Sequence, residues 1–153
     1  MHPLYIFDLD GTLALTDHRK HFLDDKDDPE RWEKFYQACD KDLPNRPVIE
    51  LFDSLYSRNK IFIWSGRSDL VYDKTIKWLA NNTGLAIEWA EEILRMRTEG
   101  DHTEDTELKR RWLHELYPQD RKRLTCVFED RQKVVDMWRQ EGVTCLQVAP
   151  GEF

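Results

Sequence analysis

The chain has 153 residues, of which 35% are charged and 40% hydrophobic, with 30 acidic against 23 basic side chains and a net charge of -7. This balance is typical of one soluble globular domain and excludes both a disordered chain and a membrane-spanning one. A chain of this length buries roughly 70% of the surface of its unfolded form, so it needs no disulfide or structural metal to fold. The acidic excess argues against binding along a nucleic acid, which depends on neutralising phosphates with Lys and Arg.

The cysteines and the N-terminal residues indicate the compartment. Cys39, Cys126 and Cys145 are odd in number and include no Cys-x-x-Cys pair, so we expect reduced core thiols rather than disulfides or a zinc site. The first residues carry no basic region followed by an apolar stretch, so we expect no signal peptide and no membrane anchor. Together these features predict a cytoplasmic protein.

Short apolar runs alternate along the chain with segments whose apolar residues lie three or four positions apart. The predicted strands are 4–7, 61–64, 124–128 and 143–148, and the predicted helices are 48–57, 70–80, 108–117 and 134–140. Strands alternating with amphipathic helices predict an α/β fold with a doubly wound, mostly parallel sheet. We find no repeat or flexible linker and expect a single domain over 1–153, with its site at the carboxyl ends of the strands.

The segment from about 15 to 46 breaks this alternation. It contains an acidic run at 24–28 and then a helical pattern through Trp32, Phe35 and Tyr36. Because it follows the first strand, we expect a small helical insert over the carboxyl edge of the sheet. The insert either caps the site and restricts access to it or is a packing subdomain, and the sequence leaves open whether it closes.

Two aspartates follow the first predicted strand, in the run Asp8-Leu9-Asp10-Gly11-Thr12. Because strand side chains alternate, both carboxylates point to the same side at the sheet edge. Two like charges this close are unfavourable unless a cation lies between them, and carboxylate oxygens suit Mg²⁺. Gly11 permits a sharp turn, and Thr12 offers a hydroxyl or an amide to a phosphate. Taken alone, the run is also compatible with an ordinary acidic strand end.

Further polar motifs follow the later strands. Ser65-Gly66-Arg67 offers a hydroxyl, an amide and a forked guanidinium to a phosphoryl group, although a single Ser before a helix is also a common N-cap. Asp105 and Lys109 have i, i+4 spacing, so on a helix they share a face and can pair. Glu129 and Asp130 end another strand, where carboxylates can complete a magnesium shell.

In this order, the four motifs resemble those of the haloacid dehalogenase (HAD) superfamily of phosphohydrolases. Residues 128–139, the closing segment 147–153 and Arg19 further resemble the 3′-phosphatase domain of the phage polynucleotide kinase/phosphatase family, over nearly the whole chain. The resemblance implies a Rossmann-like HAD core with a small cap. Two departures stand out: Glu129 occupies a position that is usually Asp in the family, and no Gly-x-x-x-x-Gly-Lys-Ser/Thr loop of a kinase is present. A kinase or ligase partner would therefore be a separate chain.

The resemblance also implies roles for the motif residues. Asp8 would attack the phosphorus to form an aspartyl-phosphate, and Asp10 would protonate the leaving hydroxyl and then activate water. Mg²⁺ would be held by Asp8, by Asp130 and, through its backbone carbonyl, by Asp10. Phosphate would be bound by Thr12, Arg19, Ser65, Gly66, Arg67 and Lys109. Asp105 would orient Lys109, and the role of Glu129 is left open.

The leading hypothesis is a magnesium-dependent phosphomonoesterase that removes 3′-phosphates from polynucleotide ends. The acidic first fifty residues favour a second function, the same chemistry on mononucleotides or other small phosphate esters. A third is a phospho-receiver signalling domain, which also combines an acidic pocket, a Ser or Thr and a Lys on a doubly wound sheet. In that fold the phosphorylated Asp lies on a middle strand, whereas here the motif with Asp8 comes first. Asp10 beside the nucleophile also favours turnover, whereas a receiver benefits from a long-lived phosphoryl group.

Weaker signals concern the surface. Basic residues gather in the last third of the chain, where they either guide an anionic substrate or form solvated helix faces. His18 and His21 lack further ligands for a metal and are interpreted as incidental. Among the six tryptophans, only Trp32 in the insert is a candidate for stacking on a base, because the helical ones lie on apolar stripes.

Overall fold

The computed structural model describes residues 1–152, so Phe153 at the end of the closing segment lies outside it. Its centre is a five-stranded sheet in the order β5-β4-β1-β6-β7, with every neighbouring pair parallel. The strands are β1 (Leu4–Phe7), β4 (Lys60–Ser68), β5 (Leu94–Arg97), β6 (Leu124–Glu129) and β7 (Cys145–Gln147). The chain extends the sheet from β1 in both directions, as in doubly wound folds.

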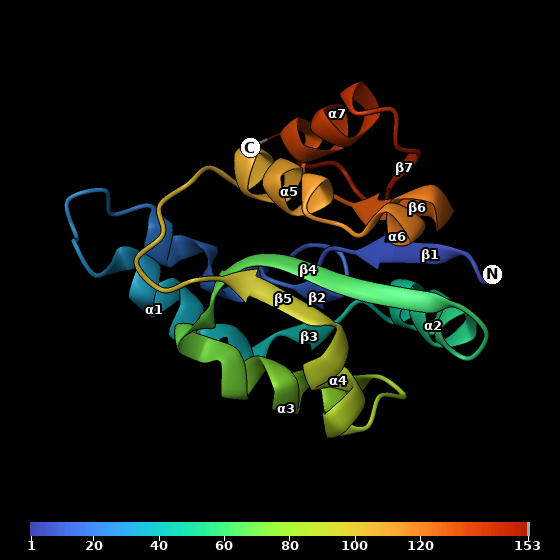
Figure 1. The fold of residues 1–153 in the computed structure, drawn as a ribbon. Coiled ribbons are helices and arrows are strands. Elements are labelled where there is room, and N and C mark those ends of the chain that lie inside the picture. The colour runs from blue at the N-terminus through green and yellow to red at the C-terminus, as the bar shows by residue number, and fades with distance from the viewer. Residues whose placement is uncertain (153) are drawn as a thin grey trace.

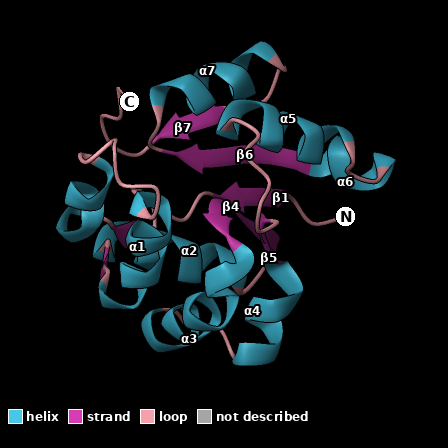
Figure 2. Cartoon of the chain, turned by 90° about the vertical axis from the view of Figure 1, so that its left-hand side faces the viewer, coloured by secondary structure: helices cyan, strands magenta, loops and turns pink. Residues whose placement is uncertain are grey.

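Helices cover both faces of this sheet (Figure 1). One side carries α2 (Arg46–Tyr56), α3 (Tyr72–Asn82) and α4 (Ile87–Ile93), and the other carries α5 (Asp105–His114), α6 (Pro118–Arg123) and α7 (Gln132–Gln140). Figure 2 shows the same two layers of helices with the strands between them. The predicted α/β fold with a doubly wound parallel sheet is confirmed.

The two faces bury separate apolar clusters, because strand side chains alternate. Phe7 stacks on Phe128 with ring centroids 4.3 Å apart and meets Phe52 of α2 edge-on at 5.1 Å. On the other face, Trp64 packs against Trp112 of α5 and Trp138 of α7, with centroids 5.8 and 6.0 Å apart. Aromatic pairs of this kind contribute about 0.5–1.5 kcal/mol beyond burial. The predicted core positions of these tryptophans are confirmed, and all three cysteines are buried and free.

All four predicted strands and all four predicted helices form, with small shifts at their ends. Among the strands of the central sheet and the helices that cover it, β5, α4 and α6 were not predicted. The β5 sequence Leu94-Arg95-Met96-Arg97 lacks the continuous apolar run of a central strand, because β5 lies at the sheet edge. The α6 sequence is polar and only six residues long, so it carries no clear amphipathic period.

The predicted insert lies between β1 and α2, on the side of the sheet where the strands have their carboxyl ends (Figure 1). A short antiparallel pair, β2 (Ala14–Leu15) with β3 (Leu43–Pro44), joins the two ends of the insert. Between them lie the 3-10 helix η1 (Asp17–Leu23), helix α1 (Arg31–Gln37) and the 3-10 helix η2 (Ala38–Lys41).

None of the helices over residues 1–152 is long and apolar enough to span a membrane.

Candidate active site

Asp8 lies directly after β1, where its backbone N–H still bonds the Phe128 carbonyl of β6 at 2.9 Å. Its carboxylate is buried and accepts from Lys109 Nζ at 2.7 Å and from the Thr12 hydroxyl at 3.1 Å. Burial and the charge of Glu129 raise the pKa of Asp8 to about 8, against the opposing charge of Lys109. The turn through Gly11 and Thr12 thus returns a hydroxyl to the Asp8 carboxylate, a contact that the sequence analysis, which assigned Thr12 to a phosphate, did not predict.

Lys109 reaches this site from α5 and is almost completely buried. Besides Asp8, its ammonium contacts Glu129 Oε2 at 2.8 Å. The other oxygen of Glu129 accepts the backbone N–H groups of Asp130 and Arg131 at 3.2 and 3.3 Å. Glu129, whose role the sequence left open, therefore fixes Lys109 and shapes the end of β6. Although burial by itself lowers the pKa of Lys109, the two carboxylates raise it, so the ammonium stays charged.

Asp8, Glu129 and Asp130 form a buried carboxylate cluster in which one oxygen of each lies within 4.8 Å of the others. Burial and the charge of Asp8 raise the pKa of Asp130 to about 7. Three buried carboxylates against one ammonium leave an excess of negative charge, and these all-oxygen donors suit a hard divalent cation such as Mg²⁺. The donor chemistry therefore fits the magnesium site that the sequence predicted.

Two glycines let the backbone approach Asp130 closely. A Cβ on Gly11, whose φ is +80°, would lie 2.0 Å from Asp130 Oδ2, and a Cβ on Gly151 would lie 2.4 Å from the Asp130 carbonyl oxygen. Contacts this short do not occur for real side chains, so both positions require glycine.

The Asp10 side chain is not part of the carboxylate cluster, although the sequence placed it on the same side as Asp8. Its Oδ1 instead accepts from Nη2 of Arg19 at 2.8 Å and from Nη2 of Arg67. Burial alone would raise the pKa of Asp10, but the Arg67 and Arg19 guanidiniums outweigh it and lower the pKa to about 2. A role of Asp10 in metal binding would thus fall to its backbone carbonyl, as the family resemblance implies.

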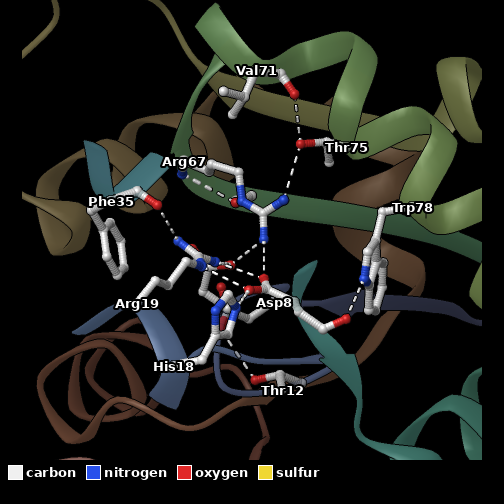
Figure 3. A network of polar contacts seen from close by, with 12 residues as sticks. Asp8, Thr12, His18, Arg19, Phe35, Arg67, Val71, Thr75 and Trp78 are labelled. Carbon is white, nitrogen blue, oxygen red and sulfur yellow. Dashed lines mark hydrogen bonds and ion pairs between the residues drawn. The ribbon is translucent and has the colours of Figure 1, made fainter. Parts of the chain in front are cut away.

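In this structure the guanidiniums of Arg19 and Arg67 donate mainly to groups of the protein itself, although the buried Nε of Arg67 has no hydrogen-bond partner within residues 1–152. Both side chains are fully buried and donate to carboxylates (Figure 3). Arg67 also donates to the Thr75 hydroxyl at 3.0 Å, and Arg19 to the Phe35 carbonyl at 3.2 Å. That they neutralise phosphoryl oxygens stays a prediction, and both guanidiniums contact Asp10.

Asp42 is a member of this network that the sequence gave no reason to select. Its fully buried carboxylate accepts from Arg19 Nε at 2.8 Å, from Arg67 Nη2 at 3.2 Å and from His18 Nε2 at 2.7 Å. Asp42 lies in a Lys- and Asp-rich part of the insert and matches no motif. His18, interpreted as incidental, belongs to this network through Asp42.

Ser65 and Gly66 lie within β4 rather than after it, because the strand continues to Ser68. Ser65 is not a helix N-cap: its hydroxyl accepts the Arg67 N–H at 3.1 Å, whereas Ser68 caps the following 3-10 helix by accepting the Leu70 N–H at 3.2 Å. A Cβ on Gly66 would lie 2.3 Å from Asp105 Oδ1, so glycine allows α5 to approach the strand.

The predicted pairing of Asp105 with Lys109 is wrong. Asp105 instead accepts from Arg97 Nη2 at 2.6 Å and from Arg131 Nη1 at 2.9 Å, and Lys109 turns to Asp8 and Glu129. The physical reason is that Asp105 is the first residue of α5, where the arginines at the ends of β5 and β6 reach it. Asp105 acts on Lys109 through its nearby charge alone, while Arg97 also holds the Gly66 carbonyl at 2.8 Å.

A surface hollow of about 1060 Å³ lies elsewhere, beside the first residues of β4 and β5, and is lined by Lys60, Trp89 and Tyr117 among others. It contains none of the motif residues. The chemistry instead gathers at the carboxyl ends of β1, β4 and β6, where sites form in doubly wound sheets.

This arrangement is a phosphohydrolase motif set assembled at one sheet edge, and comparison with known families agrees with it. The family model described as the polynucleotide kinase PNKP phosphatase domain matches residues 2–153. The chain belongs to this family. As a member of the PNKP phosphatase-domain family it is a HAD-type phosphatase and thus a hydrolase, which confirms the resemblance found in the sequence.

Solved structures support the family assignment. Two structures of the Pnkp1/Rnl/Hen1 complex, one described as an RNA repair complex, match 99% of the chain at 30% and 31% identity with TM-scores of 0.75 and 0.74. The chain spans only 44% and 48% of those two proteins. The class C acid phosphatase from Bacillus anthracis shares the fold, with a TM-score of 0.61 at 16% identity over 99% of this chain and 67% of its own.

Proposed function

We propose that this PNKP-family phosphatase domain is a magnesium-dependent phosphomonoesterase that removes 3′-phosphates from the ends of DNA or RNA. The observation that supports its chemistry most strongly is the environment of Asp8. This carboxylate faces Lys109 and Thr12 at hydrogen-bonding distance, and Asp10 follows two residues later in a separate pocket of arginines. A nucleophile and a proton-transfer group are thus kept chemically distinct.

In the first step, an Asp8 oxygen attacks the phosphorus, the new O–P bond forms, and the bond from phosphorus to the ribose 3′ oxygen breaks. The product of this step is an aspartyl-phosphate on Asp8. Lys109, already within hydrogen-bonding distance of Asp8, is placed to stabilise charge on the transferred phosphoryl oxygens. Thr12, Ser65 and the Gly66 amide are the neutral donors that we assign to the same oxygens. Phosphoryl transfer is catalysed chiefly by such positioning and charge stabilisation.

Asp8 must be ionised to act as a nucleophile, whereas burial and Glu129 raise its pKa to about 8. We assign the Asp8 and Asp130 carboxylates and the Asp10 carbonyl as the groups that would hold Mg²⁺. When bound there, the cation would favour the ionised form of Asp8 and neutralise charge on the phosphoryl group. Glu129 would remain with Lys109, which it contacts at 2.8 Å.

Asp10 serves the two proton transfers. It gives a proton to the leaving 3′ oxygen in the first step, and in the second it takes a proton from the water that hydrolyses the aspartyl-phosphate. The arginine pair lowers its pKa to about 2 against the effect of burial, which suits the basic form needed in the second step. An entering phosphate dianion brings negative charge close to Asp10 and so raises its pKa, which favours the acidic form needed first.

Recognition of an end needs only a few nucleotides, which agrees with a chain of net charge -7 that has no long basic track. Trp32 on α1 is 49% exposed and lies 5.9 Å from the ring of Tyr36. Burial raises the pKa of Tyr36, and the charges of Arg97 and Asp105 also act on it, which places the Tyr36 hydroxyl near the site. The pair of Tyr36 and Trp32 therefore extends outward from the site. We assign Trp32 to stacking on a base near the 3′ end.

The alternative is the same chemistry on mononucleotides or other small phosphate esters, which the acidic balance of the first fifty residues favours. Family membership favours a phosphatase over a phospho-receiver domain. Because the similar Pnkp1 is described in a complex for RNA repair, we also propose that a kinase or ligase acts together with this domain. A cytoplasmic location remains a prediction.

The substrate is tested by measuring phosphate release with Mg²⁺ and with a chelator. The substrates are a 3′-phosphorylated oligonucleotide, its 5′-phosphorylated twin and the matched 3′-mononucleotide, each as DNA and as RNA. Preference for the 3′-phosphorylated oligonucleotide, with a steeper salt dependence than the mononucleotide, is expected. Equal or better turnover of the mononucleotide would make the chain a small-molecule phosphatase.

A further inference from the structure

Asp42 occupies the centre of the arginine network, at the end of η2 and just before β3. Its side chain is fully buried, and both of its oxygens accept from guanidinium groups. Arg19 donates to it twice, through Nε and Nη2 at 2.8 Å each, in the forked geometry that fixes a guanidinium plane. Arg67 donates its Nη2 to Asp42 at 3.2 Å.

The same two Nη2 atoms are the ones that donate to Asp10 Oδ1. Asp42 and Asp10 therefore share both guanidiniums, and two carboxylates balance two buried cations. Without Asp42, the two fully buried guanidiniums of Arg19 and Arg67 would share only the Asp10 carboxylate, and one buried positive charge would lack a balancing anion, which is strongly unfavourable. The direction in which each guanidinium points at Asp10 thus depends on its bond to Asp42.

Asp42 has two further side-chain partners besides the arginines. Its backbone carbonyl accepts from Trp78 Nε1 of α3 at 2.8 Å, and its carboxylate accepts from His18 of η1 at 2.7 Å. Figure 3 shows His18, Arg19 and Arg67 converging on this network, which continues through Thr75 of α3 to the carbonyl of Val71, just before that helix. His18 is the most exposed member of the network, with 38% of its side chain accessible against 26% for Asp10. Asp42 connects the insert rigidly to β4 and α3.

We propose that Asp42 is a positioning residue for proton transfer: by fixing Arg19 and Arg67, it sets the orientation of the Asp10 carboxylate. This inference rests on the proposed function of Asp10 as acid and base. It assigns a chemical reason for the insert beyond covering the site, since Asp42 and Arg19 both come from it. A purely structural ion pair is the competing interpretation.

Leaving-group dependence separates the two interpretations. A ribose 3′ oxygen needs a proton to leave, whereas the nitrophenolate of para-nitrophenyl phosphate leaves readily without one. Asp10→Asn should therefore reduce kcat on the 3′-phosphorylated oligonucleotide far more than on the aryl phosphate, while Asp8→Asn abolishes both. If Asp42 acts through Asp10, Asp42→Asn follows the Asp10 pattern, with a selective loss on the order of tenfold or more.

Asp120 provides a matched control. It is also a nearly buried carboxylate between two cations, Lys60 at 3.0 Å and Arg123 at 3.0 Å, but it lies at the opposite end of β4. Asp120→Asn should lower thermal stability without changing the ratio of the two activities. Adding Asp42→Asn to Asp10→Asn should cause little further loss, because both changes then remove the same step.

A uniform loss on both substrates for Asp42→Asn, or a full further loss in the Asp10→Asn background, would overturn the inference and leave the proposed function standing. If Asp10→Asn itself fails to discriminate between the leaving groups, the proposed acid role fails, and the inference fails with it. Should Asp42→Asn not fold, His18→Ala removes one partner of Asp42 from a half-exposed position. We then expect the same selective loss of activity on the oligonucleotide, of smaller size. An unchanged ratio of oligonucleotide activity to aryl phosphate activity contradicts the inference.

Discussion

Lys109 Nζ lies 2.7 Å from Asp8 Oδ1, although the two residues are 101 positions apart in the chain. The contact joins the end of the central strand to a helix on one face of the sheet, and both groups are buried. It places a fixed cation beside the carboxylate that we propose as nucleophile, where water is excluded and the charge acts strongly.

Replacing this cation should remove transition-state stabilisation. For Lys109→Met we expect kcat to fall on the order of a hundredfold or more, in line with the loss of one preorganised electrostatic group. Lys109→Arg keeps the charge but not the compact ammonium between Asp8 and Glu129, so we expect partial activity at most. Steady-state kinetics on the 3′-phosphorylated oligonucleotide checks both variants, and a Met variant with undiminished kcat would contradict the role.

The carboxylate cluster predicts how stability depends on pH and Mg²⁺. Burial, together with a neighbouring carboxylate in each case, raises the pKa of Asp8 to about 8 and of Asp130 to about 7. A raised pKa stabilises the fold fully below the unfolded value near 4, and this contribution is lost progressively as the pH rises from there to the folded values of about 7 and 8. The metal-free protein should therefore lose stability as the pH rises toward 8. Added Mg²⁺ should restore more of this stability at the upper end of that pH range.

Thermal melting with chelator and with Mg²⁺ across that pH range measures this effect. Asp8→Asn provides the control, because it removes one titrating carboxyl without changing its shape. We expect the variant to show a weaker pH dependence and less stabilisation by Mg²⁺. Identical melting curves for the native chain with and without Mg²⁺ at every pH would contradict a metal site at this cluster.

Gly11 offers a test of the cluster geometry with a matched partner. Gly11 and Gly142 have nearly the same positive φ, +80° and +77°, but an added Cβ meets Asp130 Oδ2 at 2.0 Å only in the first case. Each change to Ala should destabilise the chain by about 1 kcal/mol or more through the strained backbone. Only Gly11→Ala should also displace Asp130, so Mg²⁺-dependent activity falls for it alone. Equal activity of the two variants would argue against this geometry.

Trp32 and Trp89 form a second matched pair, 49% and 58% exposed on different helices. Base stacking on an aromatic side chain contributes about 1–3 kcal/mol. We therefore expect Trp32→Ala to raise KM for the oligonucleotide on the order of tenfold, with little effect on the mononucleotide, and Trp89→Ala to change neither. Parallel KM measurements on the two substrates decide it, since equal effects on both would place Trp32 outside the binding surface.

The motif residues at the strand ends could be predicted because a parallel sheet brings the carboxyl ends of its strands to one edge. Asp8, Lys109 and Asp130 meet as the motif order indicated. The partner of Asp105 could not be predicted, because i, i+4 spacing says nothing of stronger partners from other elements, here Arg97 and Arg131.

The arginine network was only partly predictable for a related reason. Arg19 and Arg67 are recognisable from the family motifs, and their charge suggests phosphate as a partner. In the fold, however, they are shared between Asp10 and Asp42, and that sharing depends on how the insert folds back onto β4. Asp42 itself carries no local signal, since its role arises only from long-range contacts.

The central claim is that Asp8 becomes phosphorylated during turnover. A 3′-end-labelled phosphorylated oligonucleotide is mixed with the chain and Mg²⁺, quenched in acid within a single turnover, and the protein is digested and mapped by mass spectrometry. The account predicts phosphate on Asp8 that decays as free phosphate appears, and no such adduct in Asp8→Asn. Turnover without any phosphorylated residue, together with retained activity of Asp8→Asn, would contradict it.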